Sequence, residues 1–446
     1  MEKTTVMSRR QRKRGDLAVV AAIVVIALVV SAAALGRTAK PASSKQVTNL
    51  TFWTWVPGIQ KTVDLFEKSH PSVKIHIVNS GGAAQEYPKL ETVLKAGTGA
   101  PDLVQMGREY LPTFVATKSL VDLSKYGANS LQSKFYPAAW AQASFGGHVY
   151  EIPQDYGPIV MFYRKDVFDK LGLAPPKTWA EFAADAKKVH AANAKTYMTF
   201  VDPSASVDAQ TSMWQAGSRA FRVQGASVSI NLQDAGAKTW SNYWTGLIQK
   251  HLAQVTPSYT NAWYHALGSG TYATWLVGAW APTFMQSVIP QTKGVWRVAP
   301  IPQWKAGASV TSEDASGTAV TAQSKNPAAA AAFAIWLNSN PTSTRSLVSN
   351  SQLFPATTVL ADTPAFQNAA DPFMGGQKAN QVYVAASKHV VKGWQWLPFQ
   401  TYANSVYKDT VGAAEAKGGN LNAALKAWQA RLVAYGRGQG FKVNGS

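Results

Sequence analysis

Aromatic rings and carboxylates are the side chains of this sequence with the clearest potential for chemistry. The chain has 16 Trp and 16 Tyr, whereas charged residues make up only 15% of its 446 residues, against about 25% in an ordinary globular protein. Trp53 and Trp55 close one short apolar run, and Trp394 and Trp396 stand two residues apart in the tail. This composition indicates wide apolar surfaces with polar edges, which can be either platforms for a bound molecule or tryptophan-filled cores.

The motifs of common catalytic sites are absent from the sequence. It contains no G-x-S-x-G elbow, no H-E-x-x-H helix and no Walker loop. Its seven His residues have no spacing typical of metal ligands, so we expect neither a metal site nor a cofactor. The chain has no Cys, which excludes disulfides, cysteine nucleophiles and a lipid attached through cysteine. A glycoside hydrolase stays open as an alternative, with its two carboxylates drawn from Glu109, Glu151, Asp155, Glu313 and Asp314.

The formal net charge of +19 raises the question of nucleic-acid binding. Beyond the N-terminal segment, however, no run of five or six Lys or Arg occurs, and no basic stripe follows a helical spacing. We therefore expect no nucleic-acid partner, and we interpret the charge as a basic surface suited to an anionic cell envelope.

The N-terminal segment predicts the compartment. A basic cluster from Arg9 to Arg14 precedes an uncharged apolar stretch from Leu17 to Leu35, which is the order of an export signal. The stretch exceeds the usual cleavable core of about 7–15 residues and approaches the roughly 20 that span a bilayer. Cleavage near Ala32 to Ala34 and retention as a membrane anchor therefore both stay open. The basic flank keeps the N-terminus inside, so we expect the remainder outside the cytoplasmic membrane, after a tether over 36–47.

After the tether, short apolar runs alternate with amphipathic stretches, which favours an α/β fold. A β-α-β-α-β start of this kind suits a doubly wound sheet, which binds ligands at the carboxyl ends of its strands. Trp179, Trp240 and Trp336 lie in helical patterns and are expected in the core. The expected elements are strands at 47–55, 73–78 and 103–106, helices carrying Ile59, Val63 and Phe66 and over 87–95, a helix opened by Pro175-Pro176, a helix at 327–338, and a helical tail from about 378.

Several segments, in this order, resemble family 1 of the bacterial extracellular solute-binding proteins, the group that includes maltose-binding protein. They are LTFWTW at 50–55, APDLVQMG at 100–107 with SLVDLSKY at 119–126, GGHVYEIPQDYGPIVMFYRKDVFDKLGL at 146–173 with PPKTWAEF at 175–182, GSGTYATWLVGAW at 268–280 with APIPQW at 299–304, and AAAAAFAIWL at 328–337 with LFPATTVL at 353–360. The segment at 146–182 is the most specific. Together they span nearly all of the chain beyond the tether.

The resemblance implies a type II periplasmic-binding-protein-like fold, with two α/β lobes and a ligand cleft between them. By analogy, one lobe comprises about 48–157 and 301–345, and the other about 158–300 and 346–446. The crossings between them would be Pro153 to Pro158 and Pro300 to Pro302, where proline limits rotation about φ beside a hinge. The resemblance further implies a monomeric receptor that closes around its ligand, delivers it to the membrane permease of an ABC importer, and catalyses nothing.

The resemblance also indicates which residues face the cleft. The departure from the family is at 316–318, where this chain has Ser-Gly-Thr and relatives carry a Gly-Gly-Ser-like turn. Trp280, which follows Gly278-Ala279, stands where relatives present an aromatic platform and is the leading candidate. The full set of expected ligand-binding residues is Trp53, Trp55, Arg108, Glu109, Asp155, Tyr156, Trp214, Trp280, Glu313, Asp314, Ser316, Gly317, Trp394 and Trp396.

This set mixes the two kinds of group that a carbohydrate requires. The C–H faces of a sugar stack on aromatic rings, and its hydroxyls need donors and acceptors in fixed places. Several tryptophans favour an oligosaccharide over a single sugar ring. A peptide, a polyamine or an anion are the alternative ligands. The low number of acids argues against a polyamine, whereas an anion fits the net charge.

Overall fold

The computed structural model describes residues 47–445. The apolar stretch from Leu17 to Leu35, its basic flank and most of the expected tether lie outside these residues. Within residues 47–445, no helix is both long enough and apolar enough to cross a membrane. The described residues belong to one compact unit.

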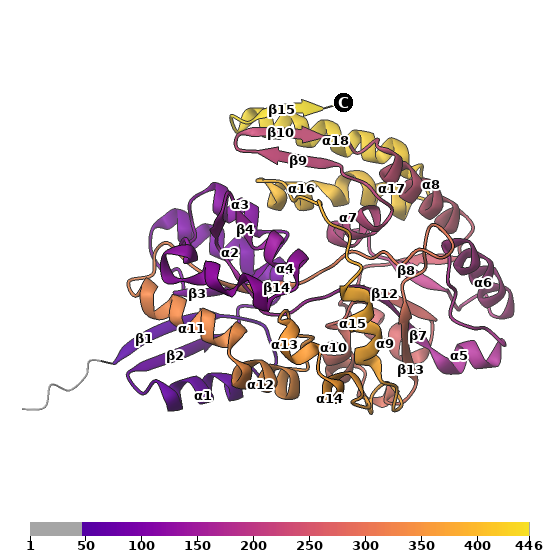
Figure 1. Ribbon diagram of the computed structural model, residues 1–446. Helices are drawn as coiled ribbons and strands as arrows, with labels where there is room; N and C mark the ends of the chain where they lie inside the picture. The colour runs from indigo at the N-terminus through magenta and orange to yellow at the C-terminus, as the bar shows by residue number, and fades with distance from the viewer. Residues whose placement is uncertain (1–46, 446) are drawn as a thin grey trace, which may run out of the picture. The chain divides into compact units, whose positions relative to one another are not determined.

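The first sheet has five strands in the order β2-β1-β3-β14-β6. Its strands are β1 (Thr48–Trp53), β2 (Val73–Val78), β3 (Leu103–Gly107), β6 (Ile152–Pro153) and β14 (Ser316–Val320). The first three are parallel, and β14 runs antiparallel to β3 and to β6. The sheet thus joins strands that lie more than 200 residues apart in the sequence (Figure 1).

Helices pack on both faces of this sheet. On one face Leu50 and Phe52 contribute to the core with Phe333 of α11, and on the other Val104 and Met106 form a second apolar cluster with Tyr87. The alternation of side chains along a strand produces this division. The helices of this part are α1 (Gln60–Ser69), α2 (Ala83–Ala96), α3 (Leu111–Ala116), α4 (Pro137–Gln142), α11 (Pro327–Ser339) and α12 (Pro341–Ser351), with short strands β4 (Ser144–Phe145) and β5 (His148–Val149).

The second sheet is centred on β7. Strand β7 (Ile159–Arg164) pairs antiparallel with both β12 (Thr274–Gly278) and β13 (Trp296–Pro300). Its residues 159–162 are fully apolar and buried, as expected for a strand covered on both faces. Two smaller sheets accompany it, made of β8 (Thr199–Val201) with β11 (Ala253–Val255), and of β9 (Phe221–Gln224), β10 (Ser227–Ile230) and the C-terminal β15 (Lys442–Gly445).

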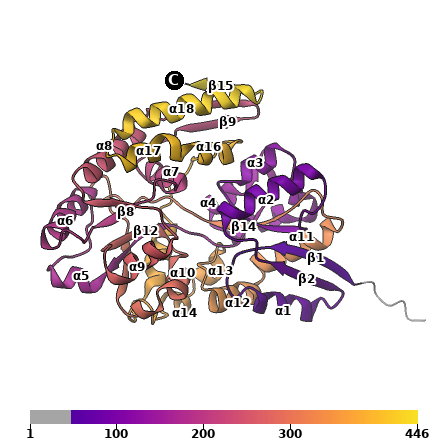
Figure 2. The same cartoon turned by 180° about the vertical axis from the view of Figure 1, so that it is seen from behind.

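Most of the remaining helices surround this second group of strands (Figure 2). Near the C-terminus a π-helix, Lys408–Gly412, interrupts the helical tail. The α-helices of this part are α5 (Lys165–Lys170), α6 (Trp179–Ala192), α7 (Ser206–Gln215), α8 (Ala235–Gln249), α9 (Asn261–Ser269), α10 (Ala281–Val288), α13 (Thr358–Ala361), α14 (Pro364–Gln367), α15 (Ala379–Ser387), α16 (Gln400–Tyr407), α17 (Ala413–Ala416) and α18 (Leu421–Gly438).

Three chain segments lie side by side between the two sheets. Residues 154–158 lead from β6 to β7, and residues 312–316 approach β14 along them. The Asp314 N–H donates to the Gly157 carbonyl at 2.9 Å, and the Tyr156 N–H donates to the Phe354 carbonyl of the third segment at 2.9 Å. A Cβ at position 157 would clash with the Asp314 carbonyl oxygen, so this approach requires glycine. We call these segments, 154–158, 312–316 and 354–356, the linker strands.

The observed elements agree with the sequence pattern where local periodicity is strong. The three expected strands and the helix at 327–338 are present, and Trp179 and Trp240 are buried. Trp336 is half-buried and packs against Phe66. Helix α6 begins after Pro175-Pro176, at a Thr178 cap whose hydroxyl accepts from the Glu181 N–H. The tail is helical, but it ends in strand β15, which pairs with β10 and was not expected. The expected second crossing at Pro300 to Pro302 lies where the passage from β13 to β14 begins.

Candidate ligand-binding site

The end of β3 carries Arg108 into a cluster of buried charges. Its guanidinium pairs with Glu313 at 2.9 Å and with Glu151 at 3.4 Å, and it donates to the Asp155 carbonyl at 2.7 Å. All four residues are buried. Because Asp155 and Glu313 belong to two linker strands, Arg108 ties the first sheet to both of them.

A second network fixes Asp155 and Ser316, which begins strand β14 rather than forming the turn that the family pattern implied. The Ser316 N–H and hydroxyl both donate to Asp155 Oδ1, at 2.8 and 2.7 Å. Gln105 Nε2 in turn donates to the Ser316 hydroxyl at 2.8 Å. A Cβ at Gly317 would clash with the Glu151 carboxylate. The Ser-Gly pair, at which the chain departs from the family pattern, therefore accommodates these two buried acids.

Burial dominates the electrostatics of this cluster. It raises the pKa of Glu151 to about 8 and that of Glu313 to about 7, although the charge of Arg108 lowers both. Burial also raises the pKa of Asp155, again against the effect of Arg108. Tyr156, stacked on Tyr136 with ring centroids 4.8 Å apart, is buried beside them. Arg108, Glu313, Asp155 and Tyr156 thus form a buried framework that supports the linker strands.

Trp280 lies next to this framework but keeps a partly exposed ring. It follows β12 and precedes α10, and its indole N–H donates to Asp314 Oδ2 at 3.2 Å. A Cβ at Gly278 would lie 2.6 Å from the indole nitrogen, so the glycine lets the ring fold back over the strand end. Trp275 and Phe284 hold it edge-on, with centroids 5.9 and 6.4 Å away. A fixed, partly open indole with a carboxylate at its edge suits a sugar ring.

The charge of Asp314 acts on two further acids. Burial, with the charge of Asp155, raises the pKa of Asp314 to about 6. Burial raises the pKa of Glu109 well above its ordinary value, and the next contribution is the charge of Asp314. Asp208 lies at the surface, but the surrounding protein desolvates its carboxyl, and this, followed by the charge of Asp314, raises its pKa to about 8. Glu109 follows β3, Asp208 belongs to α7 and Asp314 to a linker strand, so acids from three parts of the chain lie in one region.

Asp208 and Tyr259 were not expected from the sequence. Tyr259 is 52% exposed and has a positive φ of 59°, a conformation that is uncommon for a side chain of its size. Although half of the residue is exposed, the surrounding protein desolvates its hydroxyl and raises the pKa well above the ordinary value, and the charges of Asp208 and Asp314 add to this. Neither residue belongs to a segment with a recognisable motif, so local sequence offered no signal for them.

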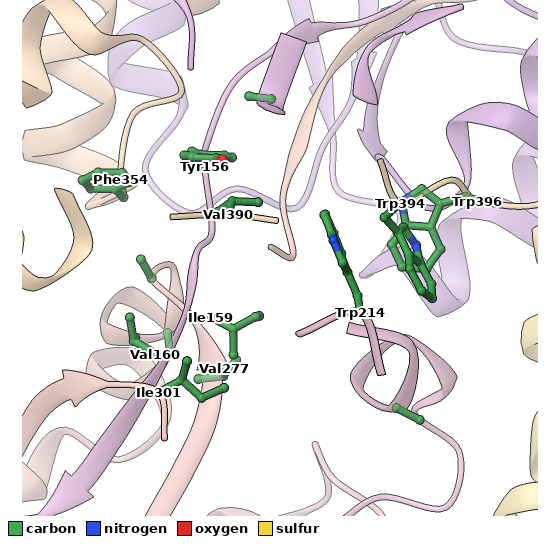
Figure 3. Packing of buried hydrophobic residues seen from close by; sticks show 14 of the residues in the cluster. Tyr156, Ile159, Val160, Trp214, Val277, Ile301, Phe354, Val390, Trp394 and Trp396 are labelled. Atoms are coloured by element: carbon green, nitrogen blue, oxygen red, sulfur yellow. The ribbon is translucent and has the colours of Figure 1, made fainter. Parts of the chain in front are cut away.

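The remaining expected tryptophans lie in packed surroundings. Trp214 is 1% exposed, its ring stacks on Trp394 at 5.7 Å, and its N–H donates to the Val391 carbonyl at 2.7 Å. Trp396 packs edge-on against Trp394 at 5.5 Å (Figure 3). Trp53 and Trp55 are half-buried against the second apolar cluster, where Trp55 meets Tyr87 at 6.1 Å. The structure thus groups Trp280, Asp314 and Glu109, and it packs the Trp214, Trp394 and Trp396 rings against one another.

The parts built on the two sheets also touch away from the linker strands. The Gln400 N–H of α16 donates to the Thr113 hydroxyl of α3 at 3.1 Å, and Gln142 Nε2 of α4 donates to the Trp394 carbonyl at 2.9 Å. Among residues 47–445, no group of three or more His, Asp or Glu side chains is arranged to hold a metal ion.

Comparison with known families accounts for this architecture. The family model described as "Bacterial extracellular solute-binding protein" matches residues 53–343, more than half of the chain. The chain belongs to this family. Its members are solute-binding proteins, and the two-lobed fold with a cleft between lobes is that of the family's solved structures.

Two solved structures of this family are similar over most of the chain. One is the ABC transporter-associated binding protein of B. animalis subsp. lactis in complex with β-1,6-galactobiose. It matches with a TM-score of 0.82 and 30% identity, covering 90% of this chain and 100% of that one. The other is the galacto-N-biose/lacto-N-biose I-binding protein of Bifidobacterium longum, with a TM-score of 0.78 and 28% identity, covering 89% and 99%. An arabinooligosaccharide-binding protein of Halalkalibacterium halodurans is 25% identical over 73% of this chain and 75% of its own length.

Proposed function

We propose that this solute-binding protein is the carbohydrate receptor of an ABC importer, that it binds an oligosaccharide between its lobes, and that it passes the sugar to a membrane permease. The observation that carries the proposal is the match, at TM-score 0.82 over 90% of the chain, to a binding protein solved with a disaccharide. The partly open indole of Trp280, anchored by Asp314, supports it from the side of the site.

In this proposal the sugar occupies the region of Trp280, Asp314, Glu109, Asp208 and Tyr259. The indole stacks on one face of a sugar ring, and the acids accept from its hydroxyls. Arg108, Asp155, Tyr156, Glu313, Ser316 and Gly317 hold the linker strands beneath it. Trp53 and Trp55 remain the predicted extension of the site toward further rings. Trp214, Trp394 and Trp396 were expected there too, but they are buried against one another and leave no ring face open to a sugar.

The lobes are proposed to comprise about 48–157 with 301–345, and about 158–300 with 346–446. They move about the linker strands. The receptor acts outside the cytoplasmic membrane as a monomer, either released after cleavage or retained by the segment at 17–35. It performs no turnover, and the close acids Glu109 and Asp314 serve binding rather than glycoside hydrolysis.

The experiment is a thermal-shift screen with β-1,6-galactobiose, lacto-N-biose and arabino-oligosaccharides, followed by calorimetric titration of the sugars that raise the melting temperature. Trp280→Ala is expected to weaken binding more than about tenfold, because loss of a central aromatic anchor costs about 2 kcal/mol or more. Trp304→Ala is the control, because this half-buried ring packs at a tilt against Trp179 and makes no ring contact with Trp280. Binding that survives Trp280→Ala would contradict the placement of the site, and hydrolysis of any sugar in the screen would contradict the absence of catalysis.

A polyamine is the second candidate ligand, because the charge of Asp314 acts on both Glu109 and Asp208 and so places three acids in one region. The sequence analysis considered the chain too poor in acids for this. Including spermidine and putrescine in the same screen distinguishes the two. A sugar that binds while the amines leave the melting temperature unchanged favours the carbohydrate receptor.

A further inference from the structure

A small cavity lies beside the proposed site, within the part built on the second sheet. Its volume is about 60 Å³, which is room for more than one water molecule. Its apolar walls include Trp240, Trp244 and Trp275, and its polar walls include Asp208 and Glu415. Of these residues, Asp208 belongs to the site described above and Trp275 contacts it through Trp280.

Two of the lining side chains have buried polar atoms without a partner among the described residues. Glu415 is 1% exposed; its Oε1 accepts from the Tyr407 hydroxyl at 2.8 Å, but its Oε2 makes no hydrogen bond. The indole N–H of Trp244, also buried, makes none either. An unpaired buried polar atom is costly, so two around one cavity suggest that something bound there completes them.

The local backbone is built to form this cavity. The π-helix Lys408–Gly412 separates Tyr407 from α17 and lets the Tyr407 hydroxyl reach Glu415. A Cβ at Gly412 would clash with the Pro203 carbonyl oxygen, so glycine lets the π-helix pack against the Asp202–Pro203 turn. Single π-turns are uncommon and frequently mark functional sites. Burial, together with the charges of Asp202 and Asp208, raises the pKa of Glu415 to about 8 despite the Tyr407 bond. Its carboxyl is therefore mostly protonated at neutral pH and can donate.

Two residues connect the cavity with the proposed sugar site. Trp275 lines the cavity and holds Trp280 edge-on at 5.9 Å. Asp208 also lines it, lies at the surface, and has its pKa raised by the charge of Asp314 after desolvation. The cavity and the proposed sugar site therefore share two neighbouring residues, Trp275 and Asp208.

We propose that this cavity is a subsite for the hydroxymethyl arm of a hexose unit in the ligand, with Glu415 and Trp244 completing the hydrogen bonds of its hydroxyl. The inference rests on the proposed carbohydrate-receptor function and adds a specificity to it. The indole walls accommodate the CH2 group. The free Glu415 oxygen can accept a hydrogen bond, or donate one when protonated, and the Trp244 N–H can donate one. The subsite prefers hexose units, which have this arm, to pentose or 6-deoxy units, which lack it.

The test compares β-1,6-galactobiose with its 6′-deoxy analogue by calorimetric titration. These sugars differ only in the one free hydroxymethyl oxygen. We expect the wild-type protein to bind the complete sugar about tenfold more tightly or better, because a hydrogen bond to a buried polar pair is involved. Ala209→Val fills the cavity, since Ala209 of α7 lines it, and should reduce the ratio to less than about threefold. Trp244→Phe removes one N–H and should reduce it in part.

Trp304→Phe is the matched control, because it removes another buried indole N–H without a partner, outside the cavity. It should leave the ratio unchanged. Melting temperatures of the unbound variants guard against a folding defect, and Trp244→Phe should not lower that temperature by more than the control does. A wild-type ratio near one, or an Ala209→Val variant that weakens both sugars equally, overturns the subsite while the receptor function stands. If only pentose sugars bind, the subsite is likewise wrong. If no sugar of the screen binds, both proposals fail.

Discussion

Replacing Arg108 with Met is expected to destabilise the protein strongly. Arg108 is 3% exposed and pairs with Glu313 and Glu151, which are equally deep. The substitution keeps an unbranched side chain but leaves two buried carboxyl groups without their cation. Removing one partner of a buried ion pair costs about 3–5 kcal/mol, and the Asp155 carbonyl loses a donor as well. We therefore expect the free energy of unfolding to fall by about 3–5 kcal/mol.

The loss of unfolding free energy in Arg108→Met should grow as pH rises, because of the pKa shifts of the two carboxyl groups. In the folded protein the pKa of Glu151 is about 8 and that of Glu313 about 7, both raised by burial and lowered by Arg108. Without Arg108 both pKa values rise further. The folded variant then holds protons above pH 7 that the unfolded chain has already released near its ordinary value of 4.5. Stability of the variant falls as pH rises through that range, so its deficit relative to wild type should grow between pH 6 and pH 9.

Denaturant titration of the two proteins at both pH values measures this. The matched control is the variant Arg108→Met with Glu151→Gln and Glu313→Gln, which also removes the unpaired carboxyl groups. It should recover more than half of the loss, because the penalty arises from stranded charge rather than from the absent guanidinium. An Arg108→Met variant within about 1 kcal/mol of wild type, or a deficit that shrinks with rising pH, would refute this reasoning.

Three further outcomes follow from the structure. Trp214→Ala should lower the free energy of unfolding without ligand by about 3–5 kcal/mol, as for a core aromatic; an unaltered melt with weakened sugar binding would make the ring a platform instead. Gly157→Ala should destabilise by about 1–3 kcal/mol because its Cβ meets the Asp314 carbonyl, whereas Gly246→Ala in open space within α8 should be neutral or stabilising in the same melt. Burial raises the pKa of Glu86 to about 8, so the stability that the protonated carboxyl contributes declines as pH rises from about 4.5 to 8. Glu86→Gln should therefore flatten the fall in melting temperature over that range. An unchanged slope would contradict this prediction.

Local pattern in the sequence determined the elements whose periodicity is strong. Strands β1, β2 and β3 and helix α11 fall where the apolar spacing predicted them, because side-chain alternation and the 3.6-residue repeat are properties of the backbone alone. Motif order over nearly the whole chain was enough to recognise the family. The same resemblance predicted Trp280, after Gly278-Ala279, as an aromatic platform. The ring is partly open in the structure.

Only the tertiary structure decided which polar and aromatic side chains contact other parts of the protein and which stay open to a ligand. A spacing identifies a face of a strand or helix but not what covers it. The stacking of Trp214 on Trp394 and the burial of Arg108 between Glu151 and Glu313 are therefore invisible in sequence. Asp208, Tyr259 and Glu415 carry no motif and lie far apart along the chain. Their shared effect arises because charges interact through space and burial strengthens that interaction, so their proximity depends on the packing of the whole fold.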